Sequence, residues 1–156
     1  MKMWIVRHGH AGGREQWQGL DADRPLDRLG QMHALGLVGD LMPGQPRRLI
    51  ASPTRRCHDT LEPLARATGR TVLTAPLLAE GVRTVEVVDF VNSQTDRTVM
   101  CTHGEVMRPL LAVLGHAGFD IRGSAVGDER FRKGVVWELD LGELTMVIRP
   151  SLEFVS

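Results

Sequence analysis

The sequence predicts an α/β fold with three layers, in which helices cover both faces of a mostly parallel central sheet that includes at least one antiparallel strand. Three observations point to this class. Short apolar runs alternate with longer segments of helical spacing. The apolar runs end in polar or glycine-rich punctuation, as strands do. Two closing strands flank Gly142-Glu143, which reads as a tight hairpin and adds the antiparallel strand.

The length and composition indicate one domain over residues 1–156. The chain has 156 residues, of which 42% are hydrophobic, enough for a buried core without disulfides or a structural metal. There is no internal repeat, low-complexity tract or linker in the sequence. We therefore expect a single compact unit.

The charge and composition argue against two classes of partner. The 19 basic and 19 acidic residues cancel, whereas nucleic acid and anionic membranes attract clustered basic residues. Aromatic residues make up 4% of the chain, too few for base-stacking platforms. No apolar run approaches the length of a membrane span, and the first residues do not resemble a signal peptide. The two cysteines fit a reducing cytosol, so we expect a cytoplasmic protein.

The first elements are a strand, a long polar stretch and a helix. Met3 to Arg7 reads as a buried strand, and residues 8–25 form a polar stretch without a clear period. A stretch of that length in a compact domain is itself a hint of function. The helix is expected to begin with Asp27 as its N-cap, run to Met42 and end at Pro43-Gly44.

The next segments continue the alternation of strands and helices. We expect a strand at Arg48–Ser52, a helix at Pro53–Gly69 and a strand at Thr71–Thr74, followed by a loop at Leu77–Val82. Pro63 should kink or restart the helix, because proline lacks the N–H that the interior of a helix needs.

The remaining segments include one ambiguous element. Thr84–Ser93 is expected to be a helix, although its valines would equally suit a strand. The elements expected after it are a strand at Arg97–Thr102, a helix at Gly104–Leu114, an irregular polar stretch at 115–133, and strands at Val135–Leu141 and Leu144–Ile148.

Polar residues cluster where three of the predicted strands end. His8 leaves the first strand, Ser52 to Arg56 leaves the second, and His103-Gly104 leaves a later one and opens a helix. The ends of parallel strands meet at the carboxyl edge of the sheet, where doubly wound folds bind ligands and helix N-termini attract anions. Arginine guanidinium groups there would bind phosphate oxygens. We expect a phosphate pocket at this edge, with the acidic residues elsewhere.

The same residues include a nucleophile. A neutral imidazole such as that of His8 can attack phosphorus and form a phosphohistidine that water then hydrolyses. Arg7, Arg56 and His103 would neutralise the charge of the phosphoryl group. No cofactor or metal is predicted, because no acidic or cysteine cluster completes a ligand set with His8 and His10, and Arg7 would repel a cation.

The motifs at these positions resemble a known family. Arg7-His8-Gly9, the Ser-Pro-x-x-Arg-x-x-x-Thr pattern from Ser52 to Thr60, and His103-Gly104 are similar to motifs of the histidine phosphatase superfamily, which includes the phosphoglycerate mutases. The resemblance implies a phosphoglycerate mutase-like fold with His8 as the phosphorylated nucleophile. It also implies that Arg7, Arg56, His103 and Gly104 bind phosphate. His10 and Ala51 depart from the usual residues.

The short chain and Asp23-Arg24-Pro25-Leu26 look most like the small SixA-type phosphohistidine phosphatases. These two features also resemble the histidine-phosphatase domains that accompany some Nudix hydrolases. Many members of the superfamily protonate the leaving oxygen with a glutamate, and Leu78-Ala79-Glu80-Gly81 resembles that segment. SixA-type enzymes manage without it, because a protonated imidazole leaves easily whereas an alkoxide needs a proton. The alternative for Glu80 is a solvated loop carboxylate.

The sequence therefore predicts a phosphatase that works through phosphohistidine on His8. The favoured substrate is phosphohistidine on a protein, since a chain this short has little room for a lid over its site. One alternative is a phosphomonoesterase that acts on a small phosphoester or nucleotide-related substrate, with Glu80 as the general acid. Another is a noncatalytic phosphate-binding regulatory module, although such a module needs no nucleophile.

Overall fold

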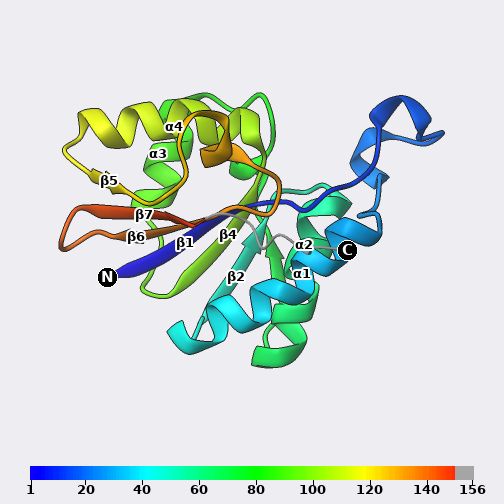
Figure 1. Ribbon diagram of the computed structural model, residues 1–156, viewed down its shortest axis with the longest axis horizontal. Helices are drawn as coiled ribbons and strands as arrows, with labels where there is room; N and C mark the ends of the chain where they lie inside the picture. The colour runs from blue at the N-terminus through cyan, green and yellow to red at the C-terminus, as the bar shows by residue number, and fades with distance from the viewer. Residues whose placement is uncertain (150–156) are drawn as a thin grey trace.

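The computed structural model describes residues 1–149, which form a seven-stranded sheet with strand order β3-β2-β4-β1-β6-β7-β5. Helices lie on both faces, so the predicted three-layer α/β architecture is confirmed (Figure 1). The strands are β1 (Lys2–Arg7), β2 (Arg48–Ala51), β3 (Val72–Thr74), β4 (Thr98–Thr102), β5 (Asp120–Arg122), β6 (Val136–Asp140) and β7 (Thr145–Arg149). The helices are α1 (Arg28–Leu41), α2 (Arg55–Thr68), α3 (Thr84–Asn92) and α4 (Gly104–His116). None of the helices within residues 1–149 is long and apolar enough to cross a membrane.

β1 lies inside the sheet and faces two hydrophobic cores. Met3 and Ile5 pack into the core beneath α3 and α4, whereas Trp4 and Val6 pack into the core beneath α1 and α2. Successive side chains of a strand point to opposite faces, so a sheet covered on both sides requires this continuous apolar run. The strand ends at Arg7, and His8 follows it.

The sheet is parallel except at β6. This strand pairs antiparallel with both of its neighbours, β1 and β7, while β5 pairs parallel with β7. The predicted antiparallel strand is thus confirmed, together with the hairpin at Gly142-Glu143. Because β6 runs against the others, its start lies at the edge where the parallel strands end.

α1 begins as predicted, with Asp27 as its N-cap. A carboxylate oxygen of Asp27 accepts a hydrogen bond from the backbone N–H of Gly30 at 2.9 Å. This bond satisfies one of the N–H groups that a helix leaves free at its start. The helix ends at Leu41, and a 3₁₀ turn at Met42–Gly44 follows.

α2 shows that Pro63 does not restart the helix. The helix begins at Arg55 rather than Pro53, and it continues through Pro63 to Thr68 without restarting. Leu61 and Leu64, on either side of the proline, are fully buried. Packing of this face against the sheet holds the turn although one backbone hydrogen bond is missing.

α3 is a helix, as expected, because Val87 and Val91 are both buried at a spacing of one helical turn. The expectation of an irregular stretch at 115–133 was wrong. That stretch contains β5 and a 3₁₀ helix at Gly127–Phe131. β5 is a short edge strand whose two outer residues are charged, so it carries no apolar period that a sequence pattern would detect.

Candidate active site

The ends of β1, β2 and β4 meet at one edge of the sheet. The backbone N–H of His8, just after β1, donates to the carbonyl of Thr102 in β4 at 3.1 Å. The N–H of Ser52, just after β2, donates to the carbonyl of Cys101 in β4 at 3.0 Å. These hydrogen bonds extend the ladder one residue beyond the strands, so the polar residues that follow each strand are brought together.

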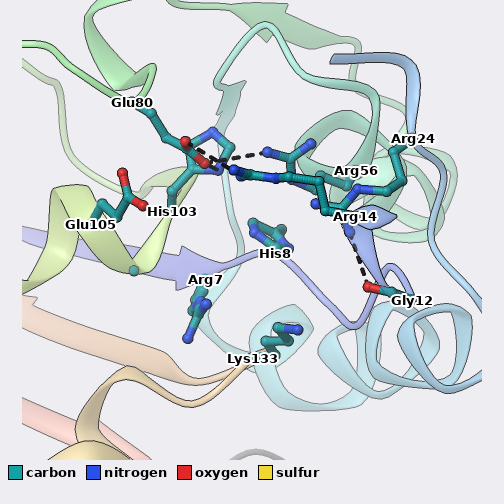
Figure 2. Close-up of a pocket in the computed structure, with 11 residues that line it drawn as sticks. Arg7, His8, Gly12, Arg14, Arg24, Arg56, Glu80, His103, Glu105 and Lys133 are labelled. Atoms are coloured by element: carbon teal, nitrogen blue, oxygen red, sulfur yellow. Dashed lines mark hydrogen bonds and ion pairs between the residues drawn. The ribbon is translucent and has the colours of Figure 1, made fainter. Parts of the chain in front are cut away.

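A pocket of about 230 Å³ opens at this edge (Figure 2). It is lined by every site residue that the sequence indicated: Arg7, His8, Arg56, Glu80, His103 and Gly104. It is also lined by residues that were not singled out for it: Gly12, Arg14, Arg24, Glu105 and Lys133. The expectation that acidic residues lie elsewhere was wrong, because Glu80 and Glu105 are part of the wall.

His8 is oriented by its own backbone. Its Nδ1 lies 2.8 Å from the carbonyl oxygen of Gly9, and because a carbonyl only accepts, Nδ1 carries the proton. The lone pair is then on Nε2. The side chain is buried, and this burial lowers the pKa of His8 to about 3, with smaller contributions in the same direction from His103, Arg56 and Arg7. The imidazole is therefore neutral and nucleophilic at pH 7.

The threonine of the second motif positions the loop after β1. Thr60 Oγ1 accepts a hydrogen bond from the N–H of Gly9 at 3.0 Å and donates to the carbonyl of Arg56 at 2.7 Å. Gly9 also lies against α1, where a Cβ on it would come within 2.9 Å of the carbonyl oxygen of Gly30. The residue after His8 is thus held from two helices.

The guanidinium groups of Arg7 and Arg56 are both anchored by protein oxygens. Arg7 donates from one terminal nitrogen to the carbonyl of Phe131. Arg56, 1% exposed, donates from NH1 to the carbonyl of Asp21 at 2.8 Å and from NH2 to the carboxylates of Asp21 and Glu80 at 3.0 and 3.3 Å. Nε of Arg7 and Nε of Arg56 are both buried, and neither has a hydrogen-bond partner within residues 1–149. A buried donor of this kind is costly unless a ligand satisfies it, so both point to an anion.

Gly104, at the start of α4, is required by the close approach of Arg7. A Cβ at this position would lie 2.9 Å from Cζ of the Arg7 guanidinium. The first two residues of α4, Gly104 and Glu105, line the pocket, so the helix N-terminus, which attracts negative charge, lies at its edge. The residue that follows His103 is therefore glycine for a steric reason.

His103 is fixed by contacts on both ring nitrogens. Its Nε2 lies 2.8 Å from the hydroxyl of Ser52 and 3.7 Å from Sγ of Cys57. Its Nδ1 lies 3.0 Å from Oε1 of Glu80 but without hydrogen-bond geometry, and among the described residues it has no hydrogen-bond partner. The ring packs edge-on against His8 with centroids 5.2 Å apart. His103 thus offers a buried donor beside His8.

Glu80 lines the pocket and is exposed to solvent. The hydroxyl of Thr102 donates to the carbonyl of Leu78 at 2.6 Å, which ties the segment before Glu80 to the end of β4. One carboxylate oxygen lies close to Arg56 and His103, and the other lies 3.9 Å from NH2 of Arg14. The residue is also exposed, so a solvated carboxylate is compatible with these ion-pair contacts.

The polar stretch of residues 8–25 supplies part of the wall that the sequence did not indicate. Asp21 accepts from Arg24 at 3.1 Å and contacts Arg14 at 3.3 Å, in addition to binding Arg56. Arg24 also donates to the carbonyls of Ala11 and Gly12. The missed signal is the mixture of acidic and basic residues in a long stretch after a strand that ends at the site.

The geometry gives no metal site. Among residues 1–149, no group of three or more histidine, cysteine, aspartate or glutamate side chains is arranged to hold an ion. His10 contacts the carboxylate of Asp27, so its ring is engaged at the start of α1.

The chain is similar in sequence to a known phosphatase. The chain is 33% identical, over 153 residues, to the 8-oxo-(d)GTP phosphatase of Mycolicibacterium smegmatis (strain ATCC 700084 / mc(2)155). The match covers 92% of this chain and 45% of that protein, so the chain spans less than half the length of this relative.

Two solved structures are similar over nearly their whole length. The crystal structure of the putative phosphohistidine phosphatase SixA from Agrobacterium tumefaciens aligns with a TM-score of 0.68 and 20% identity, and covers 99% of this chain and 97% of that one. The protein histidine phosphatase SixA complexed with tungstate aligns with a TM-score of 0.73 and 18% identity, and covers 97% of each chain. These likenesses confirm the phosphoglycerate mutase-like fold. Residues 3–83, more than half of the 156-residue chain, match the family model of the histidine phosphatase superfamily (branch 1), and the chain belongs to that superfamily.

Proposed function

We propose that this histidine phosphatase hydrolyses a phosphomonoester through a phosphoryl group carried on His8. Nε2 of His8 attacks phosphorus as the bond from phosphorus to the leaving oxygen breaks, and Glu80 gives that oxygen its proton. Water then attacks the phosphohistidine and loses a proton to Glu80, and the bond from phosphorus to Nε2 breaks to release phosphate. Arg7, Arg56 and His103 stabilise the negative charge on the phosphoryl oxygens.

One observation carries the choice of an oxygen ester. The Glu80 carboxylate lies in the pocket, 3.0 Å from His103 and 3.3 Å from Arg56, where it can reach a leaving oxygen. A phosphohistidine substrate would not need this acid, because a protonated imidazole leaves without further help. The similarity to an 8-oxo-(d)GTP phosphatase supports a small, nucleotide-related phosphoester as the substrate class.

Phosphohistidine on a protein is the second candidate. The SixA structures align over nearly all of their own length and of this chain, so the described fold carries no large extra segment that would cover the pocket. A side chain on the surface of a partner protein would then have access to His8. This candidate keeps the same nucleophile and the same arginines, and it differs only in the need for Glu80.

The experiment compares both substrates in one protein. In single-turnover measurements, Glu80→Gln is expected to slow transfer of the phosphoryl group to His8 from a phenyl or alkyl phosphate by about 100-fold, the scale of general acid catalysis, and to leave transfer from phosphohistidine nearly unchanged. If wild-type protein turns over phosphohistidine far faster than any ester, and Glu80→Gln changes both rates equally, the choice of an oxygen ester is wrong.

The nucleophile has its own test. His8→Ala is expected to abolish turnover of every substrate while the thermal unfolding transition remains cooperative. Mass spectrometry of acid-free peptides should find one phosphoryl group on His8 after brief exposure of wild-type protein to substrate. If no adduct forms with any of several donors, the chain binds phosphate without hydrolysing it, and the noncatalytic alternative holds.

The mechanism uses no metal ion, because the arginines already neutralise the phosphoryl group and would repel a divalent cation. Activity is therefore expected to persist after dialysis against a chelator. Inactivation that added metal reverses would contradict this part of the proposal.

A further inference from the structure

Lys133 lies in the pocket because the turn before β6 is tied to β1. The backbone N–H of Gly134 donates to the carbonyls of both Arg7 and His8 at 3.1 Å, and the N–H of Arg7 donates to the carbonyl of Val135 at 3.0 Å. These bonds place Lys133 beside the end of β1. The backbone on which Lys133 sits is therefore held at the pocket edge.

Among residues 1–149, the ammonium group of Lys133 has no ion-pair partner. Each of the four arginines of the pocket wall has a hydrogen bond or ion pair with protein oxygens, as described above. Lys133 has neither among residues 1–149. Asp27 is the carboxylate that acts on it, but that group is occupied by His10 and by the N–H groups of Gly12 and Gly30. The N–H groups of the Lys133 ammonium can therefore donate to a ligand.

Burial and the nearby arginines make the unpaired charge of Lys133 more costly. Lys133 is partly buried, and burial lowers its pKa, with further lowering by Arg7, Arg24 and Arg56. The pocket wall gathers five cationic side chains and leaves Lys133 unpaired among the described residues, at a cost in stability that a bound anion removes. In Figure 2, Lys133 and Arg7 lie on one side of His8, and Glu80 lies on the other.

We infer that Lys133 is a further oxyanion-binding residue, which donates from Nζ to a non-bridging oxygen of the phosphoryl group that His8 receives. The inference rests on the proposed function and adds a ligand to it. Because Glu80 stands on the leaving-group side, Lys133 holds the phosphoryl group from the opposite side, next to Arg7. The ammonium group acts equally on an ester and on a phosphohistidine, since both present the same three oxygens.

The test measures binding of tungstate, a stable oxyanion, so that it does not depend on turnover. Lys133→Met is expected to weaken tungstate binding by at least about 10-fold, as the loss of a charge-assisted hydrogen bond would. Lys133→Arg, which keeps the charge, should stay within about threefold of wild type. Lys2→Met is the matched control: Lys2 is the other lysine of the chain, lies at the far end of β1 and pairs with Glu138 at 3.6 Å.

A second measurement uses unmodified protein and is independent of folding defects. Acetic anhydride at neutral pH is expected to label Lys133 faster than Lys2, because its lower pKa leaves more free amine. Tungstate should protect Lys133 and leave the labelling of Lys2 unchanged. Peptide mapping separates the two sites and the terminal amine.

The outcomes separate the inference from the function on which it rests. If wild-type protein and Lys133→Met bind tungstate equally, and tungstate does not protect Lys133, the role of Lys133 is wrong while the proposed function stands. If wild-type protein binds no tungstate and has no phosphatase activity, both fall.

Discussion

The hydroxyl of Ser52 lies 2.8 Å from Nε2 of His103, across the gap between the ends of β2 and β4. Both residues are buried. If the hydroxyl donates to Nε2, the proton of His103 resides on Nδ1, the nitrogen that lies 3.0 Å from Glu80. The second motif thus supplies more than Arg56, because its serine contacts His103 as well.

Ser52→Ala is expected to lower kcat/KM for a phosphoester by about fivefold, equal to about 1 kcal/mol, because His103 loses the hydrogen bond that selects its tautomer. Steady-state kinetics at pH 7 measure the loss. An unchanged kcat/KM would mean that Ser52 merely fills space.

Thr60→Val tests how the loop after β1 is held. The substitution keeps the volume of the side chain but leaves the N–H of Gly9 without its acceptor, which should destabilise the fold by about 1–3 kcal/mol. Turnover should fall as well, because Gly9 accepts the proton of His8 Nδ1 through its carbonyl. Urea unfolding and kinetics measure the two losses. Thr68→Val, at the end of the same helix and remote from the motif, is the control, since its hydroxyl donates only to helix carbonyls.

Gly104→Ala should damage the site with little change in overall stability. The new methyl group would lie 2.9 Å from Cζ of Arg7, so the guanidinium must move away from the phosphoryl oxygens. A loss of about 100-fold in kcat/KM is expected, as for a misplacement of about 1 Å. Gly39→Ala in α1 meets nothing within 4 Å and is the matched control, expected to raise stability by about 0.5–1 kcal/mol without affecting activity. Equal activities for the two variants would contradict this reading of Gly104.

The pH dependence of stability follows from His8. Its pKa is about 3 in the fold against an ordinary value of 6.5, so below pH 6.5 the unfolded chain takes up a proton that the folded chain refuses. Stability should therefore fall as the pH drops from 6.5 toward 3, and should not depend on His8 above 6.5. Denaturant unfolding of wild type and His8→Asn across this range measures the difference. The variant should lose part of the acid-side slope; identical slopes would show that burial does not keep His8 neutral.

Much of the fold was predictable because its signals are local. The strand from Met3, the Asp27 cap and the buried pair in α3 each follow from residues within one turn or one strand. The three strand-exit motifs were predictable for the same reason, since parallel strands bring their ends to one edge. β5 was not, because three residues at a sheet edge carry no period.

The rest of the site depended on contacts between distant segments. Asp21 reaches Arg56 across 35 positions of sequence, and nothing near either residue marks the pair. Lys133 precedes a strand rather than following one, so the rule that ligands gather where strands end does not select it. The start of β6 is recognised as part of that edge only when the strand is known to run antiparallel. Glu80 was indicated by resemblance, and its place beside His103 depends on the tie from Thr102 to Leu78.

The anchoring of Arg7 and Arg56 has a consequence for the entropy of binding. An arginine side chain that is free in solution carries about 2 kcal/mol of rotamer entropy, which a ligand must overcome when it orders the group. Here the carbonyl of Phe131 and the oxygens of Asp21 and Glu80 have already fixed both guanidinium groups. The entropy cost of ordering these side chains therefore falls on folding. An incoming phosphate meets donors that lose almost no further freedom at each turnover.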